Sequence, residues 1–376
     1  MIVGGGLTGA ACAATFATAG IRVVLLEADR IGAGTTGRSA GLIREDVDAA
    51  FHETTAAHGL RAARLLWQGM RRASLDFAAS LRRLQIRCDL APTDLMVLSR
   101  RDPRALRKDY EARRAAGLDA SWLTPAAIAR VTAVERPGGA IRTHGASFDP
   151  FRACVGLVGS ATKRGAVVFE GTPVTRIRAG RKQVEIGTGS GTVTAQAAVI
   201  ATAAPIGDLS ALQRHLRPHH GYAVVTEPLP ATIRRELGGR TAALRDDECP
   251  PHILRWLKED RVLFTGADGP PVPERAREKV LRQRAGQLMY ELSLMYPPIS
   301  GTRAEWSWDY EHHETVDGLP YVGTHRNFPR HLFALGHARH GAGVAWLAAR
   351  VLLRAFQGTP VKGDELFGFA RILGPR

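Results

Sequence analysis

The chain opens with MIVGGGLTG (residues 1–9), continues as an alanine-rich run to Gly20, and then has an apolar run that ends at Glu27. This order predicts a strand, a tight glycine turn, a helix, and a second strand with a carboxylate at its end. A strand that passes through closely spaced glycines into a helix is typical of a dinucleotide-binding unit. We therefore expect an α/β fold organised around this segment.

The glycines of the turn have the spacing G-x-G-x-x-G. Gly4 permits the tight turn, Gly6 lets backbone approach a pyrophosphate, and Gly9 lets the helix pack closely on the strand. The free N–H groups and the dipole at a helix N-terminus favour negative charge, so we expect the phosphates beside Leu7 and Thr8. The alternative is a glycine-rich turn in an ordinary α/β protein, which the flanking strands and the following acid disfavour.

Glu27 lies roughly 20 residues beyond the turn, at the spacing of a carboxylate that accepts hydrogen bonds from ribose hydroxyls. An acid there disfavours a 2′-phosphate, so NADP is not expected. Ala28 and Arg30 are expected to contact the cofactor as well. Residues 31–41 form a second loop of small residues, whose composition alone also fits a flexible surface loop. Behind a dinucleotide fold we expect it to contact the cofactor. The expected contacts are Gly34, Thr35, Thr36, Ser39, Ala40, Gly41 and Leu42.

The composition disfavours several classes of protein. The 376 residues, 45% of them hydrophobic, suffice for two domains or for one domain with an insertion. No apolar run approaches the roughly 20 residues that span a bilayer, and no signal peptide is expected, so we predict a cytoplasmic protein. The net charge is +15, but the arginines are spread along the chain without a basic tail, so no nucleic-acid partner is predicted.

The remaining elements follow from the periodicity of apolar residues. One or two helices are predicted at 46–84, and further helices at 104–116, 125–131, 150–163, 231–237 and 274–294. Thr124 is expected to be the N-cap of the helix at 125–131. Strands are predicted at 95–98, 222–226, 252–256, 262–265 and 333–335. Four short segments at 167–170, 174–178, 183–186 and 193–195 predict a meander. The apolar segment 197–202 predicts a buried parallel strand that returns to the first sheet.

These elements predict an α/β protein with two domains. Residues 1–85, 145–205 and 310–376 are expected to form a Rossmann-like dinucleotide-binding domain with the GxGxxG turn. Residues 86–144 and 206–309 are expected to form an α+β substrate domain built on an antiparallel sheet.

The chain resembles the FAD-dependent amine and amino-acid oxidoreductases of the D-amino acid oxidase type, which include glycine oxidase and sarcosine oxidase. Four segments carry the resemblance: IVGGGLTG with LLEADRIGAGTTGRSAG, then PVTRIR, then AEWSWDYEHHETVDGLPYVG, and finally ALGHARHGAGVAWLAARVLL. Together they cover nearly the whole chain. Their order and spacing are specific for the fold, and much less so for the substrate.

The resemblance implies bound FAD, with its pyrophosphate at the glycine turn and its ribose at Glu27. It places Val174 on the adenine side. It also adds cofactor contacts at Ala201, Thr202, Gly336, Arg339, His340, Gly341, Ala342 and Gly343. Sarcosine-oxidase-like members attach FAD through a cysteine in the C-terminal third. No cysteine follows Cys249, so we expect non-covalent FAD.

An amino-acid substrate needs a cation for its carboxylate, best a forked guanidinium. Arg44 directly follows the second glycine-rich loop, and Arg255 lies on an expected strand of the substrate domain. Arg339 and His340 fall inside the C-terminal glycine loop, where positive charge would stabilise an anionic reduced flavin. These four residues are the predicted catalytic set, although a surface or structural role remains the alternative for each.

No metal site is predicted. The pairs His219-His220 and His312-His313 suggest one at first, but neighbouring residues on a strand point to opposite faces, so each pair makes a poor chelate. The four cysteines are far apart and contain no C-x-x-C spacing.

The resemblance implies oxidation of a small amine or amino acid to an imine by hydride transfer to flavin N5, with oxygen as the expected acceptor. One alternative is a dehydrogenase that passes electrons to a quinone or a partner subunit, and another is an inactive flavin-binding subunit. A homo-oligomer or a complex with a partner subunit is also compatible with the sequence. An NAD-dependent dehydrogenase is disfavoured, because NAD folds do not need the second and third glycine-rich segments.

Overall fold

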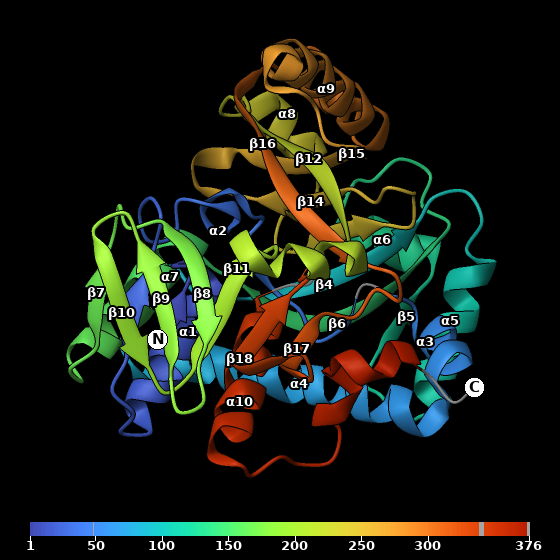
Figure 1. Cartoon of the computed structure of the whole chain (residues 1–376). Coiled ribbons are helices and arrows are strands. Elements are labelled where there is room, and N and C mark those ends of the chain that lie inside the picture. The colour runs from blue at the N-terminus through green and yellow to red at the C-terminus, as the bar shows by residue number, and fades with distance from the viewer. Residues whose placement is uncertain (48, 338–341, 374–376) are drawn as a thin grey trace.

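The computed structural model describes residues 1–47, 49–337 and 342–373, and the strands in these ranges form three sheets (Figure 1). The largest has nine strands, the second has six, and the smallest has three. The mixture of a mainly parallel sheet with a mainly antiparallel one confirms the predicted fold class.

The six-stranded sheet contains the glycine turn, and its strands follow the order β17-β18-β11-β1-β2-β7. Their bounds are β1 (Ile2–Val3), β2 (Val24–Leu26), β7 (Val167–Phe169), β11 (Ala198–Ala203), β17 (Tyr321–His325) and β18 (Phe328–Leu335). In the central strand, Ile2 lies parallel to Leu25 on one side and to Val199 on the other. The predicted return of the apolar segment 197–202 to the first sheet is therefore confirmed.

Helices bury one face of this sheet. Helix α1 (Leu7–Thr18) follows the turn and packs against α7 (Pro150–Thr162) and α10 (Gly343–Gln357). The alanines of α1 let these helices approach closely, and most of them are fully buried. Helix α10 in turn packs on α4 (Leu60–Arg83), which runs along the lower edge of the molecule in Figure 1. The predicted helical segment 46–84 is two helices, because Gly59 adopts a positive φ of 79° between α3 (Phe51–His58) and α4.

The prediction of a four-segment meander is wrong for one of the four segments. Strands β8 (Val174–Ala179), β9 (Val184–Thr188) and β10 (Gly191–Ala195) form the three-stranded antiparallel sheet. The first predicted segment is β7, which instead pairs in parallel with β2 at the edge of the six-stranded sheet. Helix α7 precedes β7 and returns the chain to that edge, as a crossover helix does between parallel strands.

The nine-stranded sheet lies above the six-stranded one in Figure 1 and has the order β16-β12-β15-β14-β13-β4-β6-β3, with β5 beside β6. Its strands are β3 (Leu42–Ile43), β4 (Ala91–Ser99), β5 (Ser121–Leu123), β6 (Gly139–Ser147), β12 (Leu216–Thr226), β13 (Ala243–Asp246), β14 (Ile253–Trp256), β15 (Val262–Gly269) and β16 (Ala304–Thr315). All neighbours are antiparallel except β13 and β4. The domain limits stay a prediction, and β16 runs through the limit proposed at residue 310.

Other helices lie on the flanks of this sheet. Their bounds are α2 (Thr35–Arg38), α5 (Arg104–Ala115), α6 (Pro125–Val131), α8 (Ala231–Glu236) and α9 (Glu274–Met295). As predicted, Thr124 caps α6, because its hydroxyl accepts a hydrogen bond from Ala127 N. Helix α9 crosses the top of the molecule in Figure 1 and packs on β12, β15 and β16. No described helix is both long enough and apolar enough to cross a membrane.

Candidate active site

A cavity of about 530 Å³ joins the glycine turn to the nine-stranded sheet. One end is formed by the turn, the end of β2 and the residues around Val174. The other end is formed by residues of β14, β15 and β16 together with Arg44. The cavity therefore connects the place expected for a dinucleotide with a wall of the nine-stranded sheet.

The glycine turn has the backbone that the spacing predicted. Gly4 has a φ of 103°, and a Cβ on it would lie 2.6 Å from the carbonyl oxygen of Ala201. A Cβ on Gly9 would collide with the carbonyl oxygen of Gly4. Gly4 therefore requires glycine for its conformation and its space, and Gly9 requires it for its space alone.

Glu27 lines the cavity at the end of β2, beside the turn. Its carboxylate accepts hydrogen bonds from the backbone N–H groups of Gly5 and Asp29. These bonds fix the carboxylate where the helix N-terminus meets the cavity. The arrangement fits the ribose position of a dinucleotide, because a carboxylate retains further lone pairs for hydroxyl donors.

The second glycine-rich loop closes over the turn. The Thr36 hydroxyl accepts a hydrogen bond from Leu7 N at 2.8 Å, and so caps the start of α1. On the other side, the Thr35 hydroxyl donates to the carbonyl oxygen of Glu311, and Trp308 Nε1 donates to that of Arg38, both at 3.0 Å. Helix α2 therefore links the dinucleotide turn to β16.

Most predicted cofactor residues line this one cavity. They are Gly4, Gly6, Leu7, Thr8, Glu27, Ala28, Arg30, Gly34, Thr35, Thr36, Ser39, Ala40, Gly41, Leu42, Val174, Ala201, Thr202 and Ala342. Gly9, Gly336 and Gly343 are not among its lining residues; a Cβ on Gly336 would lie 2.6 Å from Thr315 Cγ2, and one on Gly343 would collide with Ser74. Arg339, His340 and Gly341 lie outside the described residues.

Arg44 lines the cavity and is 5% exposed. Its Nε donates to Asp46 Oδ1 at 2.9 Å. Burial by itself would raise the pKa of Asp46, but the charges of Arg44 and Arg113 outweigh it, and the pKa lies below its usual value. The Arg44 guanidinium is therefore held by a buried, ionised carboxylate at the wall of the cavity.

Arg255 is not a lining residue and binds backbone instead. Its Nη1 donates to the carbonyl oxygens of Phe148 (2.7 Å), Ala40 (2.8 Å) and Gly41 (3.1 Å). Burial lowers the pKa of Arg255, and nearby Asp149 and Asp89 oppose this effect. The side chain thus holds the second glycine-rich loop against the start of α7, and its proposed contact with substrate stays a prediction.

The structure adds lining residues that were not predicted. They include Ile253, Thr265, Tyr310, Glu311, His312 and His313 on the nine-stranded sheet, and His337 after β18. The paired histidines were visible in the sequence, but they were considered only as metal ligands. Within the described ranges, no three His, Cys, Asp or Glu side chains gather in an arrangement that could hold a metal ion.

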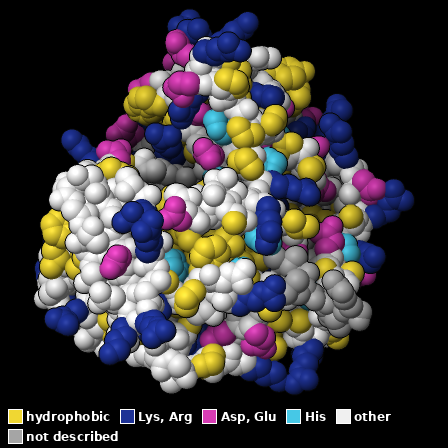
Figure 2. All heavy atoms as spheres, viewed as in Figure 1, with side chains coloured by type: hydrophobic (Ala, Val, Ile, Leu, Met, Phe, Trp, Pro, Cys, Tyr) yellow, Lys and Arg dark blue, Asp and Glu magenta, His cyan; other side chains and the backbone are white. Residues whose placement is uncertain are grey.

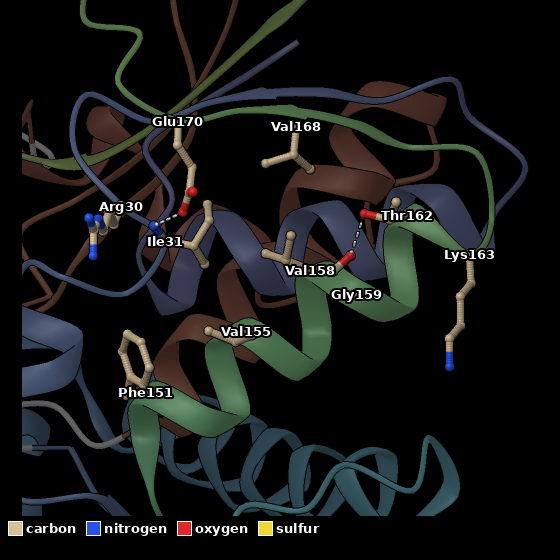
Figure 3. Close-up of a pocket in the computed structure, with 10 residues that line it drawn as sticks. All are labelled: Arg30, Ile31, Phe151, Val155, Val158, Gly159, Thr162, Lys163, Val168 and Glu170. Atoms are coloured by element: carbon tan, nitrogen blue, oxygen red, sulfur yellow. Dashed lines mark hydrogen bonds between the residues drawn. The ribbon is translucent and has the colours of Figure 1, made fainter.

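A second cavity, of about 660 Å³, lies outside the first, over α7 (Figure 3). Phe151, Val155 and Val158 of α7 form one side of it, and Val168 of β7 lies across from them. Arg30 lines both cavities, and Ile31 N donates a hydrogen bond to Glu170, which lines the second cavity. Lys and Arg side chains are scattered over the face shown in Figure 2 and form no continuous band there.

Known proteins resemble this chain along most of its length. A model of the family described as FAD dependent oxidoreductase matches residues 1–355. Gamma-glutamylputrescine oxidoreductase of Escherichia coli (strain K12) is 26% identical over 368 residues, which cover 96% of this chain and 84% of that protein. Glycine oxidase of Bacillus licheniformis is 25% identical over 386 residues, covering 98% of this chain and 95% of that protein.

Solved structures show the same fold. Glycine oxidase from Geobacillus kaustophilus aligns with a TM-score of 0.80 and 22% identity over 98% of this chain and 97% of that one. L-proline dehydrogenase from P. horikoshii aligns with a TM-score of 0.81 and 19% identity over 99% of this chain and 97% of that one. The resemblance to the D-amino acid oxidase type is confirmed, and the chain belongs to the family of FAD-dependent oxidoreductases.

Proposed function

We propose that this protein oxidises the C–N bond of a small amine or amino acid. The observation that carries the proposal is the single cavity that runs from the dinucleotide turn to a wall of ionisable side chains on β16. FAD bound in such a cavity supplies the two-electron acceptor that amine oxidation requires. The names of the gamma-glutamylputrescine and glycine relatives support an amine as the substrate class.

The residues around the turn are proposed to hold FAD without a covalent bond. Gly4 to Gly9 and the start of α1 would bind the pyrophosphate, Glu27 the ribose, and Val174 the adenine side. None of the four cysteines lines the cavity: Cys12, Cys88 and Cys154 are buried, and Cys249 is exposed elsewhere.

The far wall is proposed to position the substrate. Thr265, Tyr310, His312 and His313 present hydrogen-bonding groups to the cavity, and Glu311 offers a carboxylate that attracts an ammonium group. We propose oxygen as the electron acceptor, with a quinone or a partner subunit as the alternative.

The test uses purified holoenzyme mixed anaerobically with a panel of primary and secondary amines and amino acids. Loss of the oxidised-flavin absorbance with at least one of them is expected. Air admitted afterwards is expected to restore the absorbance and produce hydrogen peroxide. A flavin that stays reduced in air but is reoxidised by a quinone would favour the dehydrogenase alternative. A flavin that no amine bleaches would contradict amine oxidation.

A further inference from the structure

The wall formed by β12 and β16 brings together four histidines that the sequence holds in two distant pairs. We refer to His219, His220, His312 and His313 as the histidine cluster. In the antiparallel register His219 lies opposite His312, and their rings stack with centroids 5.5 Å apart. Of these two stacked rings, only that of His312 lines the cavity.

His312 is buried without a hydrogen-bonding partner. The residue is 3% exposed, and neither ring nitrogen forms a hydrogen bond with any described residue. Buried polar atoms in folded proteins almost always have a partner. Nε2 has carboxylates beside it, as described next, so Nδ1 is the ring nitrogen that is left for a ligand.

A carboxylate lies behind the ring. His312 Nε2 is 3.3 Å from Asp268 Oδ2, and the two side chains are 2% and 3% exposed. Asp268 is not a lining residue of the cavity, so the order is carboxylate, imidazole, cavity. The other ionisable groups that face His312 are Glu314 at 3.7 Å, the His219 ring, and the Tyr310 ring with its centroid 5.8 Å away. A buried carboxylate that orients an imidazole and balances its charge is the arrangement of a general base.

An amine substrate requires such a base. Alkyl ammonium groups lose their proton near pH 10.4, so almost every amine arrives protonated at neutral pH. An ammonium nitrogen has no lone pair with which to form the C=N bond. We propose that His312, oriented by Asp268, accepts this proton; the proposal rests on the amine oxidation proposed above.

The step balances as follows. One N–H bond of the ammonium breaks, its proton moves to a ring nitrogen of His312, and the electron pair stays on the amine as a lone pair. The imidazolium is stabilised by Asp268 and Glu314. A flavin held in the cavity would accept the Cα hydrogen with its electron pair as a hydride, and the nitrogen lone pair would then form the C=N bond. The imidazolium returns its proton to water after the product leaves.

His313 also lines the cavity, but the carboxylate beside it is exposed. Its Nε2 is 3.1 Å from Glu311 Oε1, and the Glu311 side chain is 55% exposed. Water screens an exposed carboxylate, so Glu311 stabilises a charged imidazole less than the buried Asp268 does. Burial also lowers the pKa of His313, and the neighbouring His312 and His219 add to this effect.

The first test measures the rate of anaerobic flavin reduction as a function of pH, using the best amine of the panel. For His312→Gln at pH 7, the ratio of the reduction rate constant to the apparent Kd of the amine is expected to fall about 100-fold, as it does when a general base is removed. The difference in this ratio between the variant and the wild type is expected to shrink toward pH 10, because more of the amine is then already neutral and needs no base. His220→Gln is the matched control, since it belongs to the cluster but does not line the cavity.

The second test counts protons and does not depend on turnover. Tert-butylamine has no Cα–H bond, so it can bind but cannot be oxidised. Its heat of binding to holoenzyme is measured at pH 7.5 in phosphate and in HEPES, whose ionisation enthalpies differ. The wild-type protein is expected to release almost no proton to the buffer, because His312 keeps it. His312→Gln is expected to release close to one proton for each amine bound.

The outcomes separate the two proposals. A wild-type protein whose flavin no amine reduces contradicts amine oxidation itself. A wild-type protein that oxidises amines but releases one proton on binding tert-butylamine overturns only the role of His312, and needs no variant. The same conclusion follows if His312→Gln and His220→Gln share one pH profile.

Discussion

Arg371 holds Asp317 through two guanidinium nitrogens, with Nε 2.7 Å from Oδ2 and Nη2 3.1 Å from Oδ1. The same guanidinium lies 4.0 Å over the Tyr321 ring, and its Nη1 donates to the carbonyl oxygens of Phe367 and Pro320. One side chain therefore ties the C-terminal segment to the residues that lead into β17.

Arg371→Ala is expected to lower the free energy of unfolding by about 3 kcal/mol, because Asp317 is left partly buried without its cation. Burial by itself raises the pKa of Asp317, but Arg371 more than reverses this, so the pair is ionised at neutral pH. Urea unfolding followed by circular dichroism measures the loss. Arg104→Ala, which removes an exposed ion pair with Asp102, serves as the control and is expected to change nothing measurable. Equal stability of the two variants would contradict the prediction.

His252 gives the stability a pH dependence. Its Nδ1 lies 2.6 Å from Asp246 Oδ2 and its Nε2 2.9 Å from Glu291 Oε2, so it joins β13 to α9. Burial opposes protonation, but the two carboxylates outweigh it and raise the pKa of His252 from 6.5 to about 9. A raised folded-state pKa stabilises the fold fully below pH 6.5, and this contribution disappears as the pH rises through about 9.

His252→Gln is therefore expected to cost on the order of 3 kcal/mol at pH 6 and much less at pH 10. Urea unfolding at the two pH values measures the difference. His144→Gln is the control, since His144 pairs with Asp94 but its side chain is 76% exposed. A cost that is the same at both pH values would show that the histidinium charge does not contribute.

Gly9→Ala is expected to abolish flavin binding, since its methyl group would collide with the carbonyl oxygen of Gly4 and displace α1 from the turn. The purified variant should be colourless, and added FAD should not restore the visible bands. Gly69→Ala provides the control: it lies within α4, where a Cβ meets nothing within 4 Å. That variant should stay yellow and should be slightly more stable, because alanine favours helix. A yellow Gly9→Ala protein would refute the assigned turn.

Arg255→Lys distinguishes loop anchoring from substrate binding. Lysine cannot reproduce the position of Nη1 among three carbonyl oxygens, so the loop at Ala40 and Gly41 should loosen. We expect flavin to dissociate about 10-fold faster, while the ratio of kcat/KM for ethylamine and alanine stays unchanged. Arg176→Lys, at an exposed position on β8, is the control. A loss confined to alanine would instead assign Arg255 to the substrate carboxylate.

The sequence predicted best what depends on local backbone. The glycine turn and the Thr124 cap follow from the conformations that a few neighbouring residues require, and both are present. The apolar segment 197–202 could be placed in the first sheet because a strand buried on both faces has a continuous apolar pattern.

Features that depend on long-range register could not be predicted. Adjacent histidines gave no sign that β12 would place His219 on His312, since that pairing follows from the register of strands far apart in the chain. Strand β7 has the same short apolar pattern as its meander neighbours, and only the crossover by α7 assigns it to another sheet. The strand that carries Arg255 was predicted correctly, but its carbonyl partners come from two other segments and could not be predicted.

In the six-stranded sheet, strands that lie side by side are synthesised at widely separated times. Central strand β1 is made long before its neighbour β11, and β18 and α10 follow later still. The emerging N-terminal segment therefore cannot enclose a cofactor during most of translation. Long-range parallel pairing is slow and leaves apolar strands exposed while it proceeds. The nascent chain should consequently depend on chaperones until its last segments emerge, and flavin should enter only afterwards.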